Sequence, residues 1–246
     1  MKHSERIRKG GVELKADTGN GDALVGMEEL LSMRHQVKEL KKDSYLFREG
    51  DAIGGVFIIR SGKIRIEKVT PNGRELTLKI CGPGQMVGEV TIFSEAPKYM
   101  LDARAIEDTI CLYISINDLE EALLSNGRLS MAFMKWMGID QQKTQTKFRD
   151  LLLHGKKGAL YSTLIRLSNS YGVQTEKGIL IDMVLTNQEL ANFCGMTREV
   201  VNRMLNDLKK RGVVTLFEGK ILLHDIEHLK VETNCENCPI YLCKID

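Results

Sequence analysis

Short apolar runs separated by glycine turns occupy the chain from about residue 43 to residue 116. The segments GGVFIIRSGKIRIEKV, TPNGRELTLKICGPGQMVGEV and ARAIEDTICLYISI each place strand-length apolar runs beside a turn. Several short strands at this spacing are typical of a small β-roll or barrel. We expect such a domain within residues 27–125, beginning with a short helix at Met27–Leu40 and preceded by a flexible, polar stretch at residues 1–26.

Helical periodicity replaces this alternation in the second half, where no proline occurs at residues 98–238. Asn126 and Gly127 end a short helix, and RLSMAFMKWMGIDQQKTQTKFRDLLL follows as one long helix within residues 126–153. HGKKG at residues 154–158 predicts a hinge after it. The long helix therefore connects the β-domain to a second domain.

An apolar stripe runs along the first half of this long helix. Leu129, Phe133, Trp136 and Met137 recur at the spacing i, i+4, i+7 and i+8. Such a stripe can be buried against the helix's own domain or against a twin helix in a dimer. We expect these four residues to form a dimer interface, although the polar second half, DQQKTQTK, predicts a weak coiled coil there.

The segment LTNQELANFCGMTREVVNRMLNDLKKRGVV predicts a helix–turn–helix unit. Thr186 and Glu189 fit a capping box at the start of its first helix, and Gly195 supplies the tight turn before the second. A hairpin, GVVTLFEGKILLHD, follows the second helix. We therefore expect a winged helix–turn–helix domain over residues 154–230, which makes the fold class α+β.

Charge is concentrated in this unit. The whole chain has a formal net charge of only +2, which excludes a strongly basic nucleic-acid coat protein. Residues 196–212, in contrast, carry five cationic and two anionic side chains. The first turns of a recognition helix enter the major groove, where Arg198 and Arg203 can pair with guanine and Glu199 with cytosine. A solvated, charged helix face is the alternative interpretation.

Two features that the sequence lacks limit where in the cell we expect the protein. No apolar run approaches the roughly 18–20 residues of a membrane span, and the first residues show no apolar core of a signal peptide. We therefore expect a cytoplasmic protein that does not bind membranes, and disulfides are disfavoured in that compartment. No nucleophile–base pair, P-loop or dinucleotide fingerprint occurs, so we do not expect an enzyme.

Three of the six cysteines lie close together in a segment at residues 231–246. Cys235, Cys238 and Cys243 have the spacing C-x2-C-x4-C. Thiolates suit zinc or the iron of an iron–sulfur cluster, and either site needs a fourth ligand. The spacing alone does not decide between the two metals.

The order of β-roll, long helix and winged helix–turn–helix resembles the catabolite activator protein/FNR family of bacterial transcription regulators over about residues 30–230. LFREGD, RSGKIRI and GQMVGEVTIF resemble its β-roll motifs, and Arg198, Glu199 and Arg203 match the Arg-Glu-x3-Arg of its reading helix. The resemblance implies a homodimer on double-stranded DNA with palindromic TGTGA-like half-sites about 34 Å apart, and contact with RNA polymerase by analogy. Arg198 and Asn202 differ from the enteric FNR pattern, which argues against TTGA-like sites.

The β-roll departs from the family at its phosphate cassette. Gly88 and Glu89 match the start of the cassette, but Tyr99 and Met100 stand where the family has Arg-Ser. A buried phosphate needs a bidentate guanidinium, and the adjacent Lys98 is only a point charge. We therefore expect no cyclic-nucleotide site and a β-roll that serves as a scaffold.

The C-terminal cysteines resemble those of the Bacillus-type FNR branch, which carries a [4Fe–4S] cluster there. That branch takes its fourth ligand from an aspartate between the long helix and the DNA-binding domain. Asp150 fits this place better than Asp140, and His224 and His228 are chemically able ligands. The resemblance implies an oxygen-responsive activator of anaerobic genes, with a cluster on Cys235, Cys238, Cys243 and Asp150. The alternative is a regulator gated by a small effector in the β-roll, with structural zinc in the tail.

Overall fold

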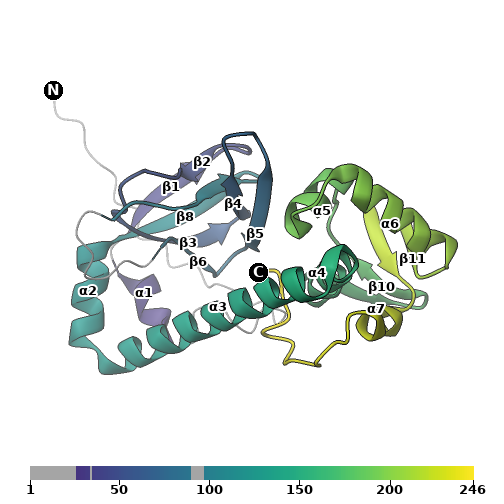
Figure 1. Cartoon of the computed structure of the whole chain (residues 1–246). Helices are drawn as coiled ribbons and strands as arrows, with labels where there is room; N and C mark the ends of the chain where they lie inside the picture. Colours follow the sequence, from purple (N-terminus) through teal and green to yellow (C-terminus); the bar gives the residue numbers. More distant parts are fainter. Residues whose placement is uncertain (1–25, 34, 90–96) are drawn as a thin grey trace.

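A computed structural model describes residues 26–33, 35–89 and 97–246 of the chain. A β-roll, a long helix and a smaller unit of helices with a β-hairpin follow one another (Figure 1). The fold class predicted from the sequence, α+β, is confirmed. The predicted flexible stretch lies outside the described residues except for its last residue, Gly26.

Two four-stranded antiparallel sheets form the β-roll, with the strand orders β1-β8-β3-β6 and β2-β7-β4-β5. Its elements are α1 (Glu28–Ser32), β1 (Gln36–Leu40), β2 (Tyr45–Phe47), β3 (Gly55–Ser61), β4 (Ile64–Val69), β5 (Glu75–Cys81), β6 (Met86–Val87), β7 (Asp102–Ala105) and β8 (Thr109–Ser115). Apolar side chains from both sheets meet between them, where Phe57, Ile59, Ile64 and Ile66 are buried. This core is what the alternating apolar runs predict.

The helix predicted at Met27–Leu40 is wrong in its second half. Only Glu28–Ser32 is helical, whereas Gln36–Leu40 forms β1 and pairs antiparallel with β8. The pairing gives β8 a hydrogen-bonded neighbour on each side, because β3 lies along its other edge. This long-range gain outweighs the weak local preference of the segment for helix.

Two capped helices follow the β-roll, α2 (Ile116–Ser125) and α3 (Gly127–Leu153). The Asn126 side chain accepts hydrogen bonds from the backbone N–H groups of Arg128 and Leu129, which starts α3 at the predicted place. Figure 1 shows α3 running along the β-roll and reaching the second unit. The predicted hinge at residues 154–158 is mostly helical, and only His154 separates α3 from the next helix.

The second unit is a winged helix–turn–helix. Its elements are α4 (Gly155–Tyr171), β9 (Gly172–Thr175), β10 (Gly178–Ile181), α5 (Asn187–Cys194), α6 (Arg198–Lys210), β11 (Val214–Phe217), β12 (Lys220–Leu223) and α7 (Ile226–Glu232). The capping box of Thr186 and Glu189 is present, and Gly195 has φ +62° between α5 and α6. Leu190 and Val201 are buried in the shared core. The structure thus confirms the helix pair and the hairpin.

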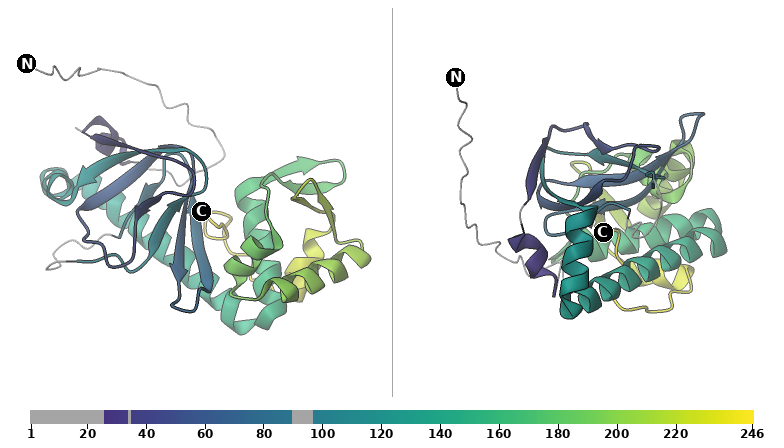
Figure 2. Two further views of the ribbon diagram at one scale, coloured as in Figure 1. Left: turned by 90° about the horizontal axis from the view of Figure 1, so that it is seen from above. Right: turned by 90° about the vertical axis from the view of Figure 1, so that its left-hand side faces the viewer.

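The two units meet at β5, α3 and α5. Asn192 on α5 donates to a carboxylate oxygen of Glu75 on β5 over 2.6 Å. Lys147 on α3 donates through Nζ to two carbonyl oxygens of β5 at 2.9 and 2.6 Å, and it lies over the ring of Phe193 on α5. Figure 2 shows α5 beside β5 from above. Lys147 therefore touches both units.

Burial of Lys147 makes the stability of this junction depend on pH. Desolvation lowers the pKa of Lys147 to about 7, and the charge of Arg166 acts in the same direction. The unfolded chain, with a lysine pKa near 10.5, binds more protons between pH 7 and 10, so the lysine makes stability rise with pH in that window. This contribution is at most about 1.4 kcal/mol per pH unit.

The variant Lys147→Met is expected to flatten that rise, and urea unfolding at pH 7, 8 and 9 measures it. Lys209→Met, at an exposed position of α6, is the matched control and should keep the parental slope. Equal slopes for parent and Lys147→Met would contradict the assignment.

None of the helices among the described residues is long and apolar enough to cross a membrane.

Candidate metal centre and DNA-reading surface

The three C-terminal cysteines and Asp150 line one small cavity. The C-terminal tail (residues 233–246) leaves α7 and passes the end of α3 and the side of α4. The cavity between them is lined by Arg149, Asp150, His154, Ser162, Ile165, Thr233, Asn234, Cys235, Glu236, Cys238 and Cys243. All four residues that are candidate metal ligands therefore line the same cavity.

Two arginines hold the carboxylate of Asp150, which is only 7% exposed. Arg166 donates to Oδ2 through Nη2 at 2.7 Å and through Nε at 3.2 Å. Arg149 donates to Oδ1 through Nη2 at 2.9 Å and through Nε at 3.1 Å. Both oxygens therefore carry charge-assisted hydrogen bonds, which are among the stronger kinds in proteins.

The thiol of Cys243 is the most buried of the three. Burial raises its pKa to about 11, while the charge of Arg166 opposes the shift and the neighbouring Cys238 and Asp150 add to it. Cys235 and Cys238 are half-buried. Cys243 is therefore a protonated thiol at neutral pH in this form of the protein.

The donor set suits a thiolate-bound metal or cluster in kind, because it offers three thiols and one carboxylate around one cavity. Among residues 26–33, 35–89 and 97–246, however, no three His, Cys, Asp or Glu side chains stand close enough to one point to hold a metal ion. The cavity measures about 20 Å³. Binding of a metal or cluster would therefore require these side chains to turn toward one point and Asp150 to release at least one arginine.

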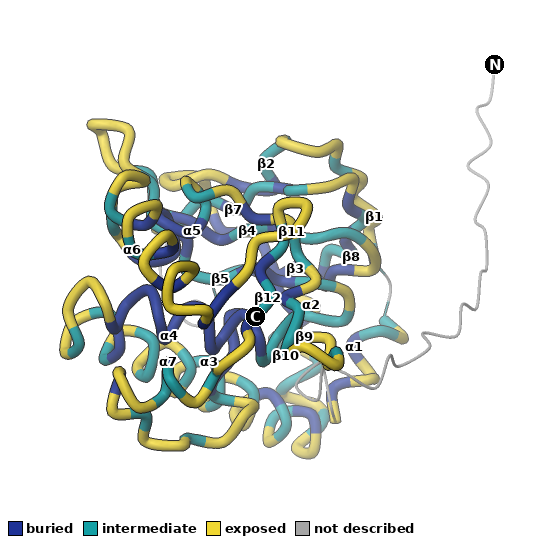
Figure 3. Tube along the Cα trace, turned by 90° about the vertical axis from the view of Figure 1, so that its right-hand side faces the viewer, coloured by how far each residue is buried: buried dark blue, intermediate teal, exposed yellow. Residues whose placement is uncertain are grey.

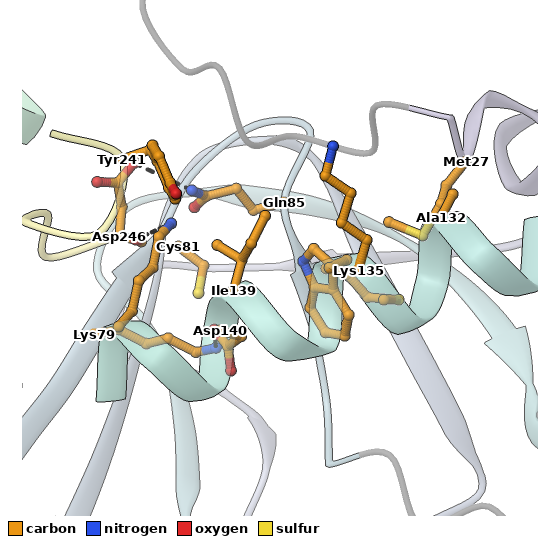
Figure 4. A pocket seen from close by; sticks show the side chains of 13 residues that line it. Met27, Lys79, Cys81, Gln85, Ala132, Lys135, Ile139, Asp140, Tyr241 and Asp246 are labelled. Atoms are coloured by element: carbon orange, nitrogen blue, oxygen red, sulfur yellow. Dashed lines mark hydrogen bonds and ion pairs between the residues drawn. The ribbon is translucent and has the colours of Figure 1, made fainter. Parts of the chain in front are cut away.

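The other candidate fourth ligands lie elsewhere. Asp140 pairs with Lys79 at 2.9 Å and lines a separate cavity of about 490 Å³ between α3 and the β-roll, shown in Figure 4. His224 is hydrogen-bonded at the wing, and His228 packs near Tyr161. His154 does line the cysteine cavity, but the sequence places it in a predicted hinge and gives no sign of this role.

The predicted DNA-reading residues share one exposed surface. Arg198, Glu199, Asn202 and Arg203 lie in the first two turns of α6 and are all exposed. The helix N-terminus lowers the pKa of Glu199, because its backbone N–H and the side chain of Thr197 donate to the carboxylate. Val201 and Leu205 point the opposite way, into the core. The helix therefore presents both cations and the anion to solvent.

Aromatic packing fills the β-roll at the cassette. Tyr99 is 4% exposed and stacks on Phe47 with ring centroids 3.6 Å apart. Its hydroxyl donates to the carbonyl of Gly55 at 3.2 Å, and Glu89 accepts from the backbone N–H of Met100 at 2.8 Å. Residues 90–96 of the cassette lie outside the described part of the chain. Tyr99 and Glu89 are thus both engaged within the protein.

The predicted dimer interface needs a correction. Leu129 and Phe133 are 1% and 2% exposed because they pack into the chain's own core beside α1, β3 and α2. Trp136 is half-buried and tilts against the ring of Phe133. Only Met137, at 40% exposure, remains open. Leu129 and Phe133 therefore face the β-roll and are not available to a second chain, whereas Met137 is open to solvent.

Comparison with known proteins agrees with this architecture. The cyclic nucleotide-binding domain family matches residues 37–126, and the Crp-like helix-turn-helix domain family matches residues 158–231. The "Anaerobic regulatory protein" of Bacillus subtilis (strain 168) is 54% identical over 219 residues, which cover 89% of this chain and 92% of that protein. The "CRP-like cAMP-activated global transcriptional regulator" of Mycobacterium tuberculosis is 28% identical over 199 residues, covering 81% and 88%.

A solved structure shows the same fold. The c-di-GMP responsive global regulator CLP of Xanthomonas campestris superimposes with a TM-score of 0.69 at 23% identity, covering 81% of this chain and 98% of that one. The matched relatives are transcription regulators, not enzymes. The β-roll, the long helix, the exposed reading helix and these matches show that the chain belongs to the Crp/FNR family of DNA-binding transcription regulators.

Proposed function

We propose that this regulator senses oxygen through a [4Fe–4S] cluster held by Cys235, Cys238, Cys243 and Asp150, and that the cluster sets its DNA-binding form. The observation that carries the proposal is the shared cavity, where an aspartate from the end of α3 meets three cysteines from the tail. The name of the Bacillus subtilis relative, "Anaerobic regulatory protein", supports a role in anaerobic gene activation. Contact with RNA polymerase follows by analogy with the family.

The position of the site explains how it can control DNA binding. A cluster bound there supplies a centre that oxygen destroys. Asp150 belongs to the last turn of α3, whereas the cysteines follow the DNA-binding unit, so a shared site joins the two parts in one arrangement. A ligand that binds one arrangement better shifts the population toward it. The carboxylate is a harder donor than thiolate and the more exchangeable ligand for iron.

Metal analysis of anaerobically purified protein tests this proposal. We expect a brown protein with absorption near 400 nm and about four irons and four sulfides per chain. A colourless protein with one zinc per chain would contradict the cluster and favour a structural zinc site, with gating by a small effector in the β-roll.

We further propose a homodimer built on the exposed side of α3. Seven positions spaced alternately by three and four residues form a heptad-like stripe, which we call the α3 stripe. Its members are all exposed: Met131, Met134, Gly138, Gln141, Gln145, Phe148 and Leu152. This is the spacing of the a and d positions of a coiled coil. A second copy is the occupant that this self-complementary pattern fits, and a two-fold dimer matches a palindromic operator.

An acidic substitution in the α3 stripe tests the dimer. Met134→Asp is expected to weaken dimerisation by about tenfold or more, because an unpaired charge would be buried between the helices. Leu124→Asp is the matched control, since Leu124 is 83% exposed on α2 and lies outside the stripe. Analytical ultracentrifugation across a concentration series measures both. Equal dissociation constants for Met134→Asp and the parent would overturn the proposed interface.

In such a dimer, we propose that Arg198, Glu199, Asn202 and Arg203 of each chain read one TGTGA-like half-site. Their exposure together at the start of α6 supports this role.

We also propose that the β-roll binds no cyclic nucleotide. The buried Tyr99, at the place where the family has its phosphate-binding arginine, supports this view.

A further inference from the structure

Arg166 is the largest side chain that the described residues bury completely, with 1% of its surface exposed. It lies in the middle of α4, whose buried residues run from Gly158 to Ser168 (Figure 3). A guanidinium has five N–H donors and stays charged, so its burial is costly unless every donor direction is used. Arg166 lies beside the cysteine cavity, because it bonds Asp150 in the cavity wall.

The partners of Arg166 come from two distant segments. Nε and Nη2 donate to Oδ2 of Asp150 at the end of α3. Nη1 donates to the carbonyl oxygens of Leu242 and Lys244, at 3.0 and 3.4 Å, on either side of Cys243. One rigid, planar group thus fixes the carboxylate and the backbone around the third cysteine relative to each other.

The tail continues from this point to the β-roll. The backbone N–H of Ile245 donates to Ser170 Oγ on α4 at 2.9 Å. Its carbonyl accepts from the backbone N–H of Ile80 on β5 at 3.4 Å, and Gln85 donates to Oδ2 of Asp246 at 3.1 Å. Figure 4 shows Gln85 and Asp246 facing one another above α3. The tail therefore links α4 to the β-roll as well as lining the cysteine cavity.

The two oxygens of Asp150 are held differently. Oδ2 is bonded by the fully buried Arg166, whereas Oδ1 is bonded by Arg149, whose side chain is 26% exposed. Arg149 also pairs with Glu236, which lies between two cysteines in the tail. Arg149 can therefore leave Oδ1 and keep a carboxylate partner. Oδ1 is thus the oxygen that Arg149 can release toward a metal, while Oδ2 stays bonded to Arg166.

We propose that Arg166 is the positioning residue of this centre. It presents Oδ1 of Asp150 toward the cysteines, supplies a positive charge beside three thiolates and a carboxylate, and holds the tail so that it docks on the β-roll. Metal occupancy and the contact between the tail and the β-roll then become one coupled equilibrium. The part that concerns the metal rests on the proposed function, whereas holding the tail is a property of the metal-free protein as well.

The variant Arg166→Lys tests both the metal-positioning and the tail-holding role. It keeps the positive charge but loses the planar guanidinium that donates to Asp150 and to the tail carbonyls at the same time. Hydrogen exchange of the amides of residues 242–246 is measured on air-exposed, metal-free protein, and we expect about tenfold faster exchange in the variant. Iron per chain is measured on anaerobic protein, and we expect a fall of about tenfold. Arg149→Lys is the matched control, since Arg149 donates to Asp150 and pairs with Glu236, which precedes residues 242–246; exchange of the amides of residues 242–246 should match the parent.

Unchanged tail exchange or unchanged iron content in Arg166→Lys overturns the proposal. Should that variant not fold, the double variant Asp150→Asn with Arg166→Gln removes both charges of the pair, which buried sites tolerate better than one unpaired charge. The double variant tests only whether Arg166 holds the tail. If the amides of residues 242–246 exchange as slowly in it as in the parent, the proposal is also overturned. A parent protein without iron contradicts the proposed function instead, and this outcome is visible before any variant is compared.

Discussion

Asp150→Asn is expected to lower the iron content of the anaerobic protein by about tenfold or more, since changes even to the outer partners of a metal ligand commonly cost 10–100-fold in affinity. A neutral amide keeps the shape of the side chain, and its oxygen can still accept from Arg166, while the anionic donor is lost. Iron and sulfide per chain, together with the absorption near 400 nm, measure the effect.

The matched control for this variant is Asp140→Asn. Asp140 pairs with Lys79 in the separate cavity between α3 and the β-roll, and its side chain is 39% exposed. It should retain the parental amount of iron. Retention of iron in Asp150→Asn would remove Asp150 from the ligand set, and its loss in Asp140→Asn would transfer the role to that residue.

Arg203→Ala is expected to weaken binding to a TGTGA-palindrome duplex by about 1–3 kcal/mol per half-site, which is the usual discrimination of one bidentate contact with guanine. Arg203 is exposed on the second turn of α6, on the face opposite the buried Val201 and Leu205. Its loss removes a base contact, so binding to a scrambled duplex should change far less. Titration of both duplexes by fluorescence anisotropy at one fixed salt concentration measures the ratio.

Lys210→Ala serves as the control for Arg203. Lys210 lies in the last turn of α6 and is exposed, a position suited to phosphate contact. Its replacement should weaken binding to both duplexes about equally and reduce the salt dependence. An equal loss on both duplexes in Arg203→Ala would contradict a base-reading role for that residue.

The parts of the fold that the sequence predicts well are those with strong local signals. Glycine turns between alternating runs predict the β-roll, and the Asn126 cap predicts where α3 begins. The capping box at Thr186 and the turn at Gly195 do the same for the helix–turn–helix. In each case the residues that specify the element lie within it, so no distant contact is needed.

The errors arise where distant contacts decide the structure. The segment Gln36–Leu40 becomes a strand because β8 offers it an edge. The most apolar stripe of α3 predicts a dimer interface, yet the β-roll covers two of its four residues, Leu129 and Phe133. The exposed α3 stripe contains Gly138 and two glutamines, so its apolar signal is weaker than that of the covered stripe.

The candidate site shows the same division. The cysteine spacing is a local pattern that indicates metal ligation. Arg166, in contrast, lies in a helical segment whose sequence carries no motif that indicates a role at the site. Its role depends on Asp150 and on tail carbonyls far along the chain. His154 lies in a stretch whose glycines predict a hinge, so its place in the cavity wall becomes visible only in the fold.

The most direct test of the central claim divides one anaerobic preparation in two and exposes one half to air. Iron content and binding to the TGTGA-palindrome duplex are then measured on both halves. We predict that the air-exposed half loses its iron and binds the duplex about tenfold or more weakly, which is within the usual range of allosteric coupling. Equal DNA affinity in the two halves despite loss of the iron would contradict control of DNA binding by the cluster.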